Sequence, residues 1–207
     1  MGKAMQHWNF NFLCAIDCET TGLDPEIHEL IQIAILPLDS EIKPINVMPF
    51  YIVLKPDCPE LIDPKAMKIN KLTKAINTYG LDREKAKDLL GEWVVKLGMG
   101  VNKFGTAKTI TPLGHNYAFD KAFMIKWLGV GLYNEYFHPH YRDTLTVASF
   151  IDDYTAWRAE DVPFGKKDLT WVADKVGYKR KGAHDALQDC VTTANAYRLM
   201  LQKGHLI

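Results

Sequence analysis

The chain has 207 residues, of which 47% are hydrophobic and 24% charged, a composition typical of a folded globular protein and not of a disordered one. Its 25 Lys and Arg residues balance 25 Asp and Glu residues, so the formal net charge is zero and excludes a general long-range attraction to polyanions. A nucleic acid partner would need a local basic patch or metal ions. We expect a single domain spanning residues 1–207.

The cysteines and the apolar segments bear on the compartment. The sequence contains no Cys-x-x-Cys pair, and Cys14 and Cys18 lie in an apolar run, where they are typical of small core residues. Neither a long apolar leader nor a run of roughly 20 apolar residues is present. We therefore expect a cytoplasmic protein in a reducing environment, without a membrane partner.

Three segments near the start of the chain predict β-strands. Residues 12–18 form a nearly continuous apolar run, typical of a strand buried on both faces, and Asp17 and Glu19 lie at its end. Residues 29–38 and 47–54 predict two further strands. Three strands in succession favour an antiparallel meander.

The middle of the chain predicts a helix, a strand and a second helix. From Asp82, a candidate N-cap, apolar residues recur at helical spacing until Gly98. Residues 109–115 then predict a strand, and residues 117–128 a helix that Gly129 closes. A strand followed directly by a helix indicates an α/β crossover.

The last third predicts three helices around one loop. Residues 143–150 predict the start of a helix, and residues 151–167 a mobile surface loop. Asp168 is expected to cap a short helix that ends before Gly177. The final helix is expected to begin after His184, with Asp185 as N-cap and Gln188 completing a capping box, and to end at Gly204.

The most informative pair of residues is Asp17 and Glu19. Side chains two apart on a strand point to the same face, so both carboxylates project together from the end of a buried strand. Repulsion and desolvation would make at least one of them hold a proton unless cations compensate, and hard oxygen ligands favour Mg²⁺ or Mn²⁺. A solvated turn beginning with Asp-x-Glu is the plain alternative.

A second candidate element lies where the strand 109–115 meets the next helix. Asn116 is placed to cap that helix, and Asp120 falls in its first turn, where the helix dipole favours an anion. Both residue types are also common there for purely helical reasons.

The third candidate element is the pair His184 and Asp189. Within one helix, an offset of five residues would splay the side chains by about 140°, so they converge only if His184 lies on the preceding loop. A histidine there is suited to taking a proton from water near neutral pH. A solvated loop histidine paired with Asp185 is the alternative.

Taken in order, these elements resemble the three motifs of the DEDDh 3′→5′ exonucleases. The matching segments are 17–23 (Asp-Cys-Glu-Thr-Thr-Gly-Leu), 115–120 (His-Asn-Tyr-Ala-Phe-Asp) and 184–189 (His-Asp-Ala-Leu-Gln-Asp). Residues 142–145 also resemble the family's Asp-Thr-Leu element. Residues 66–73 resemble its Ile-His-Gly-Ile-Thr segment, with Asn70 and Lys71 in place of His-Gly. The resemblance covers nearly the whole chain.

The resemblance implies an α/β, ribonuclease H-like fold, with a mixed central sheet of antiparallel meander plus parallel strands flanked by helices. It also implies two divalent cations, Mg²⁺ or Mn²⁺, held by Asp17, Glu19, Asp120 and Asp189. Asp17 would bridge the cations, and His184 would act as general base in attack on the terminal phosphodiester. Because the carboxylates form a repulsive cluster, we expect that removing Asp17 or Asp189 abolishes hydrolysis and leaves the fold intact.

The substrate implied is the 3′ end of single-stranded DNA or RNA, cut to nucleoside 5′-monophosphates. DNA is favoured because the motifs resemble the proofreading-type members most closely, and a separate polymerase subunit is a candidate partner. RNA is the alternative within the same family. Candidate substrate contacts are the wedge residue Leu23, two threonines, the cap residue and three basic residues: Thr20, Thr21, Leu23, Asn116, Lys179, Arg180 and Lys181.

Two other readings compete with the exonuclease. A catalytically silent nucleic-acid-binding domain would have no reason to keep four carboxylates and the histidine. A metal-dependent endonuclease of the wider ribonuclease H-like class would leave the pair of His184 and Asp189 unexplained. A nucleotide-driven motor is the remotest alternative, because the sequence has no Gly-x-x-x-x-Gly-Lys-Ser/Thr loop.

Overall fold

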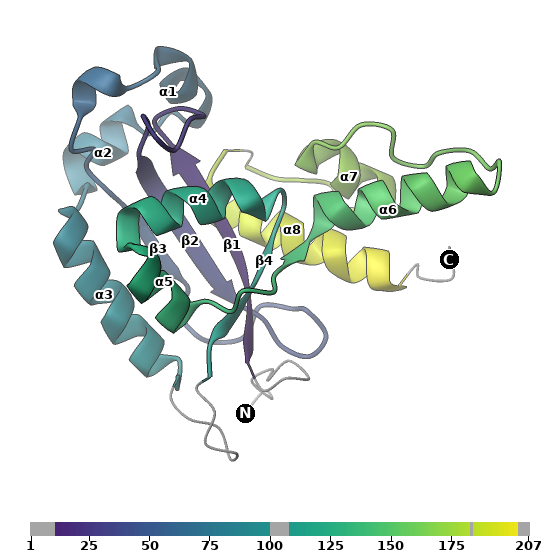
Figure 1. Ribbon diagram of the computed structural model, residues 1–207, viewed down its shortest axis with the longest axis horizontal. Coiled ribbons are helices and arrows are strands. Elements are labelled where there is room, and N and C mark those ends of the chain that lie inside the picture. Colours follow the sequence, from purple (N-terminus) through teal and green to yellow (C-terminus); the bar gives the residue numbers. More distant parts are fainter. Residues whose placement is uncertain (1–10, 100–107, 183, 203–207) are drawn as a thin grey trace.

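The computed structural model describes residues 11–99, 108–182 and 184–202. In this part of the chain, the strands form one mixed sheet in the order β3-β2-β1-β4-β5 (Figure 1). The strands are β1 (Phe12–Thr20), β2 (Leu30–Pro37), β3 (Phe50–Val53), β4 (Ile110–Gly114) and β5 (Arg142–Asp143). The sheet confirms the ribonuclease H-like α/β prediction.

The sheet combines a meander with parallel strands, as predicted. β1 pairs antiparallel with β2, and β2 pairs antiparallel with β3. β4 runs parallel to β1 on its other side, and β5 runs parallel to β4. The third predicted strand is shorter than residues 47–54, because β3 pairs only over four residues with β2. β1 is thus central, and its end carries Asp17 and Glu19 into the interior.

Helices cover both faces of the sheet. They are α1 (Pro64–Asn70), α2 (Thr73–Tyr79), α3 (Arg83–Lys96), α4 (Tyr117–Leu128), α5 (Val130–Tyr136), α6 (Thr144–Trp157), α7 (Leu169–Val176) and α8 (Ala186–Gln202), with a 3₁₀ turn at Pro59–Leu61. None of the helices in the described ranges is long and apolar enough to span a bilayer.

The alternation of β1 side chains separates two cores. Cys14, Ile16 and Cys18 face one way and pack with residues of α3, α4 and α5. Leu13 and Ala15 face the other way and pack with Ala186, Cys190 and Ala194 of α8. Since successive strand residues alternate, Asp17 and Glu19 belong to the α8 face. This places the carboxylates of β1 opposite the first turn of α8.

The predicted caps of two helices are confirmed. The carboxylate of Asp82 accepts hydrogen bonds from the backbone of Glu84 and Lys85 at 2.9 and 3.2 Å and begins α3. Asp168 accepts from the backbone of Trp171 at 2.9 Å and begins α7, which ends at Gly177 in the left-handed conformation. These residues begin helices because their side chains satisfy N–H groups that have no partner inside the helix.

The loop predicted at residues 151–167 is wrong for its first part. α6 continues to Trp157, because its apolar residues Ala148 and Ile151 pack against α7 and α8. The remaining loop is pinned to α6 rather than free. The carboxylate of Asp152 accepts hydrogen bonds from the backbone of Phe164 at 2.8 Å and of Gly165 at 2.9 Å. Buried Phe164 completes this attachment.

Three short helices, α1, α2 and α5, were not predicted from the sequence. Each has seven residues, too few for a clear helical periodicity of apolar residues. α8 begins as predicted, whereas its predicted end at Gly204 lies outside the described residues.

Candidate active site

The two carboxylates at the end of β1 lie near those of Asp120 and Asp189, and we call this cluster of four the acidic pocket. The pKa of Asp17 is well above its ordinary value because of burial first, and then because of the negative charges of Asp120, Asp189 and Glu19. Asp17 nevertheless keeps part of its surface open to solvent, as a group that admits a cation must. Burial and the charge of Asp189 raise the pKa of Glu19 to about 7. The strand therefore delivers both groups to one place, as the alternation predicted.

Asp120 enters the same pocket from the first turn of α4. It is buried, and its Oδ1 accepts a hydrogen bond from the backbone N–H of Cys18 in β1 at 2.9 Å. Burial raises its pKa to about 8, although backbone hydrogen bonds to the carboxylate act in the opposite direction. A side chain 102 residues away in sequence is thus tied to the strand between Asp17 and Glu19.

The predicted capping by Asn116 is only half right. Asn116 does precede α4, but its backbone is left-handed, with φ of 64°, and its side chain accepts no capping hydrogen bond. The carboxylate of Asp143 caps α4 instead, accepting from the backbone of Asn116 at 3.1 Å and of Tyr117 at 2.7 Å. The side chain of Asn116 is exposed and free of a capping duty.

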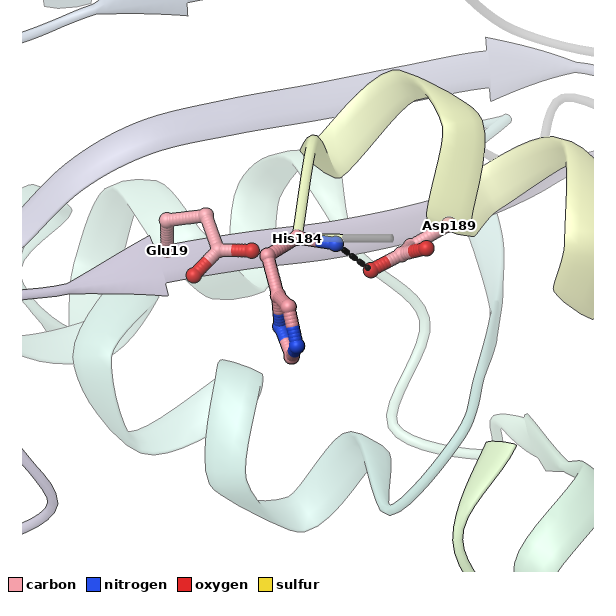
Figure 2. A group of neighbouring side chains, drawn as sticks. All are labelled: Glu19, His184 and Asp189. Atoms are coloured by element: carbon pink, nitrogen blue, oxygen red, sulfur yellow. Dashed lines mark hydrogen bonds between the residues drawn. The ribbon is translucent and has the colours of Figure 1, made fainter. Parts of the chain in front are cut away.

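Asp189 and His184 come from the start of α8, as Figure 2 shows. Asp189 is buried in the first turn of the helix, and the exposed His184 lies just before it with a φ of 63°. The backbone N–H of His184 donates to Asp189 Oδ2 at 3.3 Å. Glu19, His184 and Asp189 each offer one ligand atom, and these atoms lie within 4.8 Å of one another. The loop placement of His184 allows the convergence that one helix would forbid.

A polar network that the sequence reading missed fixes the start of α8. The carboxylate of Asp185 accepts from the backbone of Gln188 at 3.1 Å, which confirms it as the cap, and from the Tyr51 hydroxyl of β3 at 2.6 Å. Gln32 of β2 donates to Tyr51 Oη at 3.1 Å and accepts from the backbone of Ala186 at 3.0 Å. A buried glutamine within the apolar strand 30–37 was the available signal.

The residues after β1 form a tight turn that presents Leu23. Thr20 Oγ1 donates to the carbonyl of Gly22 at 2.6 Å, and Thr21 Oγ1 accepts from the backbone of Glu29 at 2.9 Å. Both threonines are buried, whereas Leu23 is 79% exposed. The threonine side chains therefore serve the turn itself, whereas Leu23 projects outward as an apolar wedge would.

The turn is supported by the residue that departs from the family pattern. Asn70, at the end of α1, donates from Nδ2 to the carbonyl of Thr20 at 3.2 Å and accepts from the backbone of Leu72 at 3.1 Å. Lys71 follows in the left-handed conformation, with φ of 58°, which favours glycine. Asn70 thus makes a buried contact with the turn, and Lys71 adopts the left-handed backbone conformation that glycine adopts most easily.

The three predicted basic residues lie in different situations. Lys179 and Lys181 are exposed. Arg180 is committed to the pocket, since its Nε donates to Asp189 Oδ1 at 2.8 Å and its Nη2 donates to Asp189 Oδ2. A groove of about 550 Å³ adjoins this pair and is lined by Lys166, Asp168, Thr170, Trp171, Asp174, Lys179 and Arg180. A larger hollow of about 660 Å³ near α1 and α2 contains no acidic residue and lies apart from the carboxylates.

The pocket suits a hard divalent cation. Burial first, and then the negative charges of neighbouring carboxylates, raise the pKa of both Asp17 and Glu19. Anions at such close quarters are stable together only when protons or cations neutralise them. Carboxylate oxygens with one imidazole form a donor set that suits Mg²⁺ or Mn²⁺. The residues present therefore fit the cations that the motifs imply.

Comparison with known proteins identifies the family. A family model described as Exonuclease, RNase_T, matches residues 14–197. The chain is 28% identical over 176 residues to an oligoribonuclease of Vibrio campbellii, covering 84% of each chain. An oligoribonuclease of Neisseria meningitidis is 24% identical over 199 residues, covering 91% of this chain and 89% of the relative.

The fold also matches solved structures. The nuclease domain of 3′hExo, described as a DEDDh family member bound to rAMP, has a TM-score of 0.65 and 18% identity, covering 94% of this chain and 93% of that one. Escherichia coli exonuclease I in complex with a dA16 oligonucleotide has a TM-score of 0.68 and 21% identity. The match covers 95% of this chain but 42% of exonuclease I, so the chain spans about two fifths of that protein. The chain belongs to the DEDDh family of 3′→5′ exonucleases, which hydrolyse phosphodiester bonds.

Proposed function

We propose that this protein removes nucleoside 5′-monophosphates from the 3′ end of short single-stranded RNA with the help of two divalent cations, Mg²⁺ or Mn²⁺. The observation that supports the proposal is the clustering of Glu19, Asp189 and the exposed His184, whose ligand atoms lie within 4.8 Å of one another. The charges of Asp120, Asp189 and Glu19 also act on Asp17. Such a donor set is what in-line phosphodiester hydrolysis needs, because charge develops on both the attacking and the leaving oxygen.

RNA replaces DNA as the favoured substrate. The expectation of DNA came from the resemblance of the motifs to those of proofreading-type exonucleases, and the comparisons do not support it. Two relatives that match over most of both chains are named oligoribonuclease. The matches cover 84% and 89% of the length of these relatives. The likeness to exonuclease I with bound DNA concerns the fold alone at 21% identity. A polymerase subunit as partner finds no support in these comparisons.

Each residue has a proposed task. Asp17, Glu19, Asp120 and Asp189 hold the cations, which when bound would stabilise negative charge on the reacting oxygens. His184, exposed at the edge of the pocket, takes the proton from the attacking water. Leu23 wedges against the terminal base, since it is the exposed apolar residue of the turn after β1.

The remaining substrate contacts are proposed from their positions. Backbone groups of Thr20 and Thr21 line the turn, and the exposed side chain of Asn116 is available to position the terminal nucleotide. Lys179 and Lys181 would meet incoming phosphates, together with Arg180 once its present partner is replaced. We also propose that the chain forms a single domain and that the protein acts in the cytoplasm.

The experiment compares matched 5′-labelled oligonucleotides. RNA and DNA of the same sequence, five and twenty-five nucleotides long, are incubated with Mg²⁺, Mn²⁺ or chelator. We expect a ladder that shortens from the 3′ end, fastest on the short RNA and absent with chelator. Asp120→Asn is the matched inactive control, since it keeps the shape of the side chain and removes its charge.

Other outcomes would point elsewhere. Faster shortening of DNA than of RNA would indicate that the protein is a deoxyribonuclease. A single internal cut would indicate an endonuclease, and binding without any shortening would indicate a silent nucleic-acid-binding domain.

A further inference from the structure

Arg180 is a built part of the acidic pocket. Its Nε donates to Asp189 Oδ1 at 2.8 Å, its Nη2 donates to Asp189 Oδ2, and its Nη1 donates to Thr170 Oγ1 at 2.7 Å. The side chains of Arg180 and Asp189 are only 10% and 6% exposed. A planar guanidinium on both oxygens of a carboxylate is a strong and directional pair. Arg180 is therefore not a solvated surface cation.

The same carboxylate belongs to the candidate cation site. The ligand atoms of Glu19, His184 and Asp189 lie within 4.8 Å of one another. The positive charge of Arg180 already acts on this site, because it lowers the pKa of both Asp17 and Glu19 against the effect of their acidic neighbours. A divalent cation at Asp189 would meet a fixed positive charge and a carboxylate whose two oxygens are both occupied.

We propose that Arg180 is an internal counter-cation that competes with the divalent cation for Asp189, so that loading of this site requires Arg180 to leave the carboxylate. The inference rests on the proposed function, since it assigns a cation to Glu19, His184 and Asp189. The inference goes beyond the proposed function because it names a protein group that opposes cation binding.

Displacement of Arg180 would have a consequence for substrate. Arg180 both contacts Asp189 and lines the neighbouring groove, whose other charged residues are Lys166, Asp168, Asp174 and Lys179. A phosphodiester offers two oxygens in the same geometry as a carboxylate. Cation binding therefore supplies a phosphate-binding group to the groove at the moment when the pocket becomes competent.

The test measures cation affinity without substrate. Calorimetric titration with MnCl₂ alone, at pH 8.5 where protons compete least, is carried out on the wild type, Arg180→Ala and Lys179→Ala. We expect Arg180→Ala to bind Mn²⁺ about tenfold more tightly, because a competing positive charge is gone. Lys179→Ala also removes one positive charge from the groove, but Lys179 is not the partner of Asp189. The Mn²⁺ affinity of this variant should change less than about twofold.

Two further variants guard against loss of folding. Arg180→Gln keeps a polar side chain with one amide donor while removing the charge, and it should also bind Mn²⁺ more tightly. Arg180→Lys keeps the charge but loses the fork, so its affinity should lie between those of the wild type and Arg180→Ala. The rise in melting temperature on adding Mn²⁺, measured on the same variants, should follow the same order.

The direction of the change decides the result. Tighter binding supports competition, because a purely structural loss at Arg180 would weaken the site. Unchanged or weaker binding in both Arg180→Ala and Arg180→Gln would overturn the inference while leaving the proposed function standing. A wild type that binds no Mn²⁺ would overturn the inference and the proposed cation site together, whereas failure to degrade RNA with the affinity shift intact would count against the substrate alone.

Discussion

The pocket has two halves that manage negative charge in different ways. In the half built by β1 and α4, the negative charge of Asp120 raises the pKa of buried Asp17, and Asp120 itself accepts a hydrogen bond from the backbone N–H of Cys18. In the half built by α8, Asp189 is held by the guanidinium of Arg180 and by the backbone of His184. In the first half the carboxylates repel one another, whereas in the second half the guanidinium of Arg180 compensates the charge of Asp189. The same residue type is therefore destabilising in one half and stabilising in the other.

The largest effects are expected when each half loses its carboxylate. Asp17→Asn and Asp189→Asn should both reduce hydrolysis by about 10³-fold or more, since each removes a proposed cation ligand. Their effects on the melting temperature in chelator should have opposite signs. Asp17→Asn relieves repulsion and should raise it, whereas Asp189→Asn leaves Arg180 buried without its partner.

The buried ion pair of Arg180 and Asp189 argues against the expectation that removing Asp189 leaves the fold intact. Removing Asp189 should not leave the fold intact, because breaking a buried ion pair costs about 3–5 kcal/mol. Thermal melting and urea unfolding of both variants measure the difference. Equal destabilisation by the two substitutions would mean that the halves do not differ, and the comparison would fail.

The next effect concerns the histidine beside the α8 half. His184→Ala should reduce kcat by about 10²–10⁴-fold, because the proton of the attacking water would have to go to solvent. The affinity for Mn²⁺ should fall much less, since the carboxylates remain. Single-turnover kinetics together with a metal titration separate the two effects, and an equal loss of both would make His184 chiefly a ligand.

The β1 and α4 half should dominate the pH dependence of stability in chelator. Burial raises the pKa of Glu19 from 4.5 to about 7 and that of Asp120 from 3.8 to about 8. The folded state therefore binds more protons than the unfolded state between about pH 4 and pH 8, so its stability should fall as the pH rises through this range. Saturating Mg²⁺ should remove most of the fall, because the cation then replaces the protons.

The Asp120→Asn variant provides the control for that measurement. Its melting temperature in chelator should depend less on pH than that of the wild type, because one of the two raised groups is gone. A wild-type melting temperature that rises steadily from pH 5 to pH 8 would contradict the raised pKa values of Glu19 and Asp120.

The smallest effect tests how α8 is positioned. Tyr51→Phe removes the hydroxyl that donates to Asp185 at 2.6 Å, next to His184. Loss of about 1 kcal/mol of positioning corresponds to roughly a fivefold decrease in kcat, with little change in melting temperature. Tyr79→Phe, on a residue that is 71% exposed in α2, is the matched control and should have no effect.

The two halves also differ in how far they could be predicted. Asp17 and Glu19 lie on a strand whose period of two fixes their common direction, so their convergence followed from the sequence. The position of His184 on a left-handed residue before α8 was needed for convergence but was not fixed by spacing. Arg180 looked like a member of a basic surface run, since nothing local distinguishes it from Lys179 and Lys181.

The errors have a common physical origin. Asn116 occupies a cap position, but the carboxylate of Asp143, 26 residues from Tyr117, is closer to the free N–H groups and caps α4 instead. The helix α6 extends past residue 150 because its apolar face packs on α7 and α8, which the local loop-forming residues do not reveal. In each case a contact distant in sequence outweighed a local preference.

The sequence by itself determined the family, the central buried strand and the caps of α3, α7 and α8, and it named the four carboxylates and the histidine as candidates for the site. These features depend on residue type and on short-range periodicity, which the chain carries locally. Only the tertiary structure decided that Arg180 holds Asp189, that Tyr51 and Gln32 fix the start of α8, and that Asn70 supports the turn before Leu23. Those contacts join segments brought together by the packing of the sheet, and the energies that select them arise only once the core has formed.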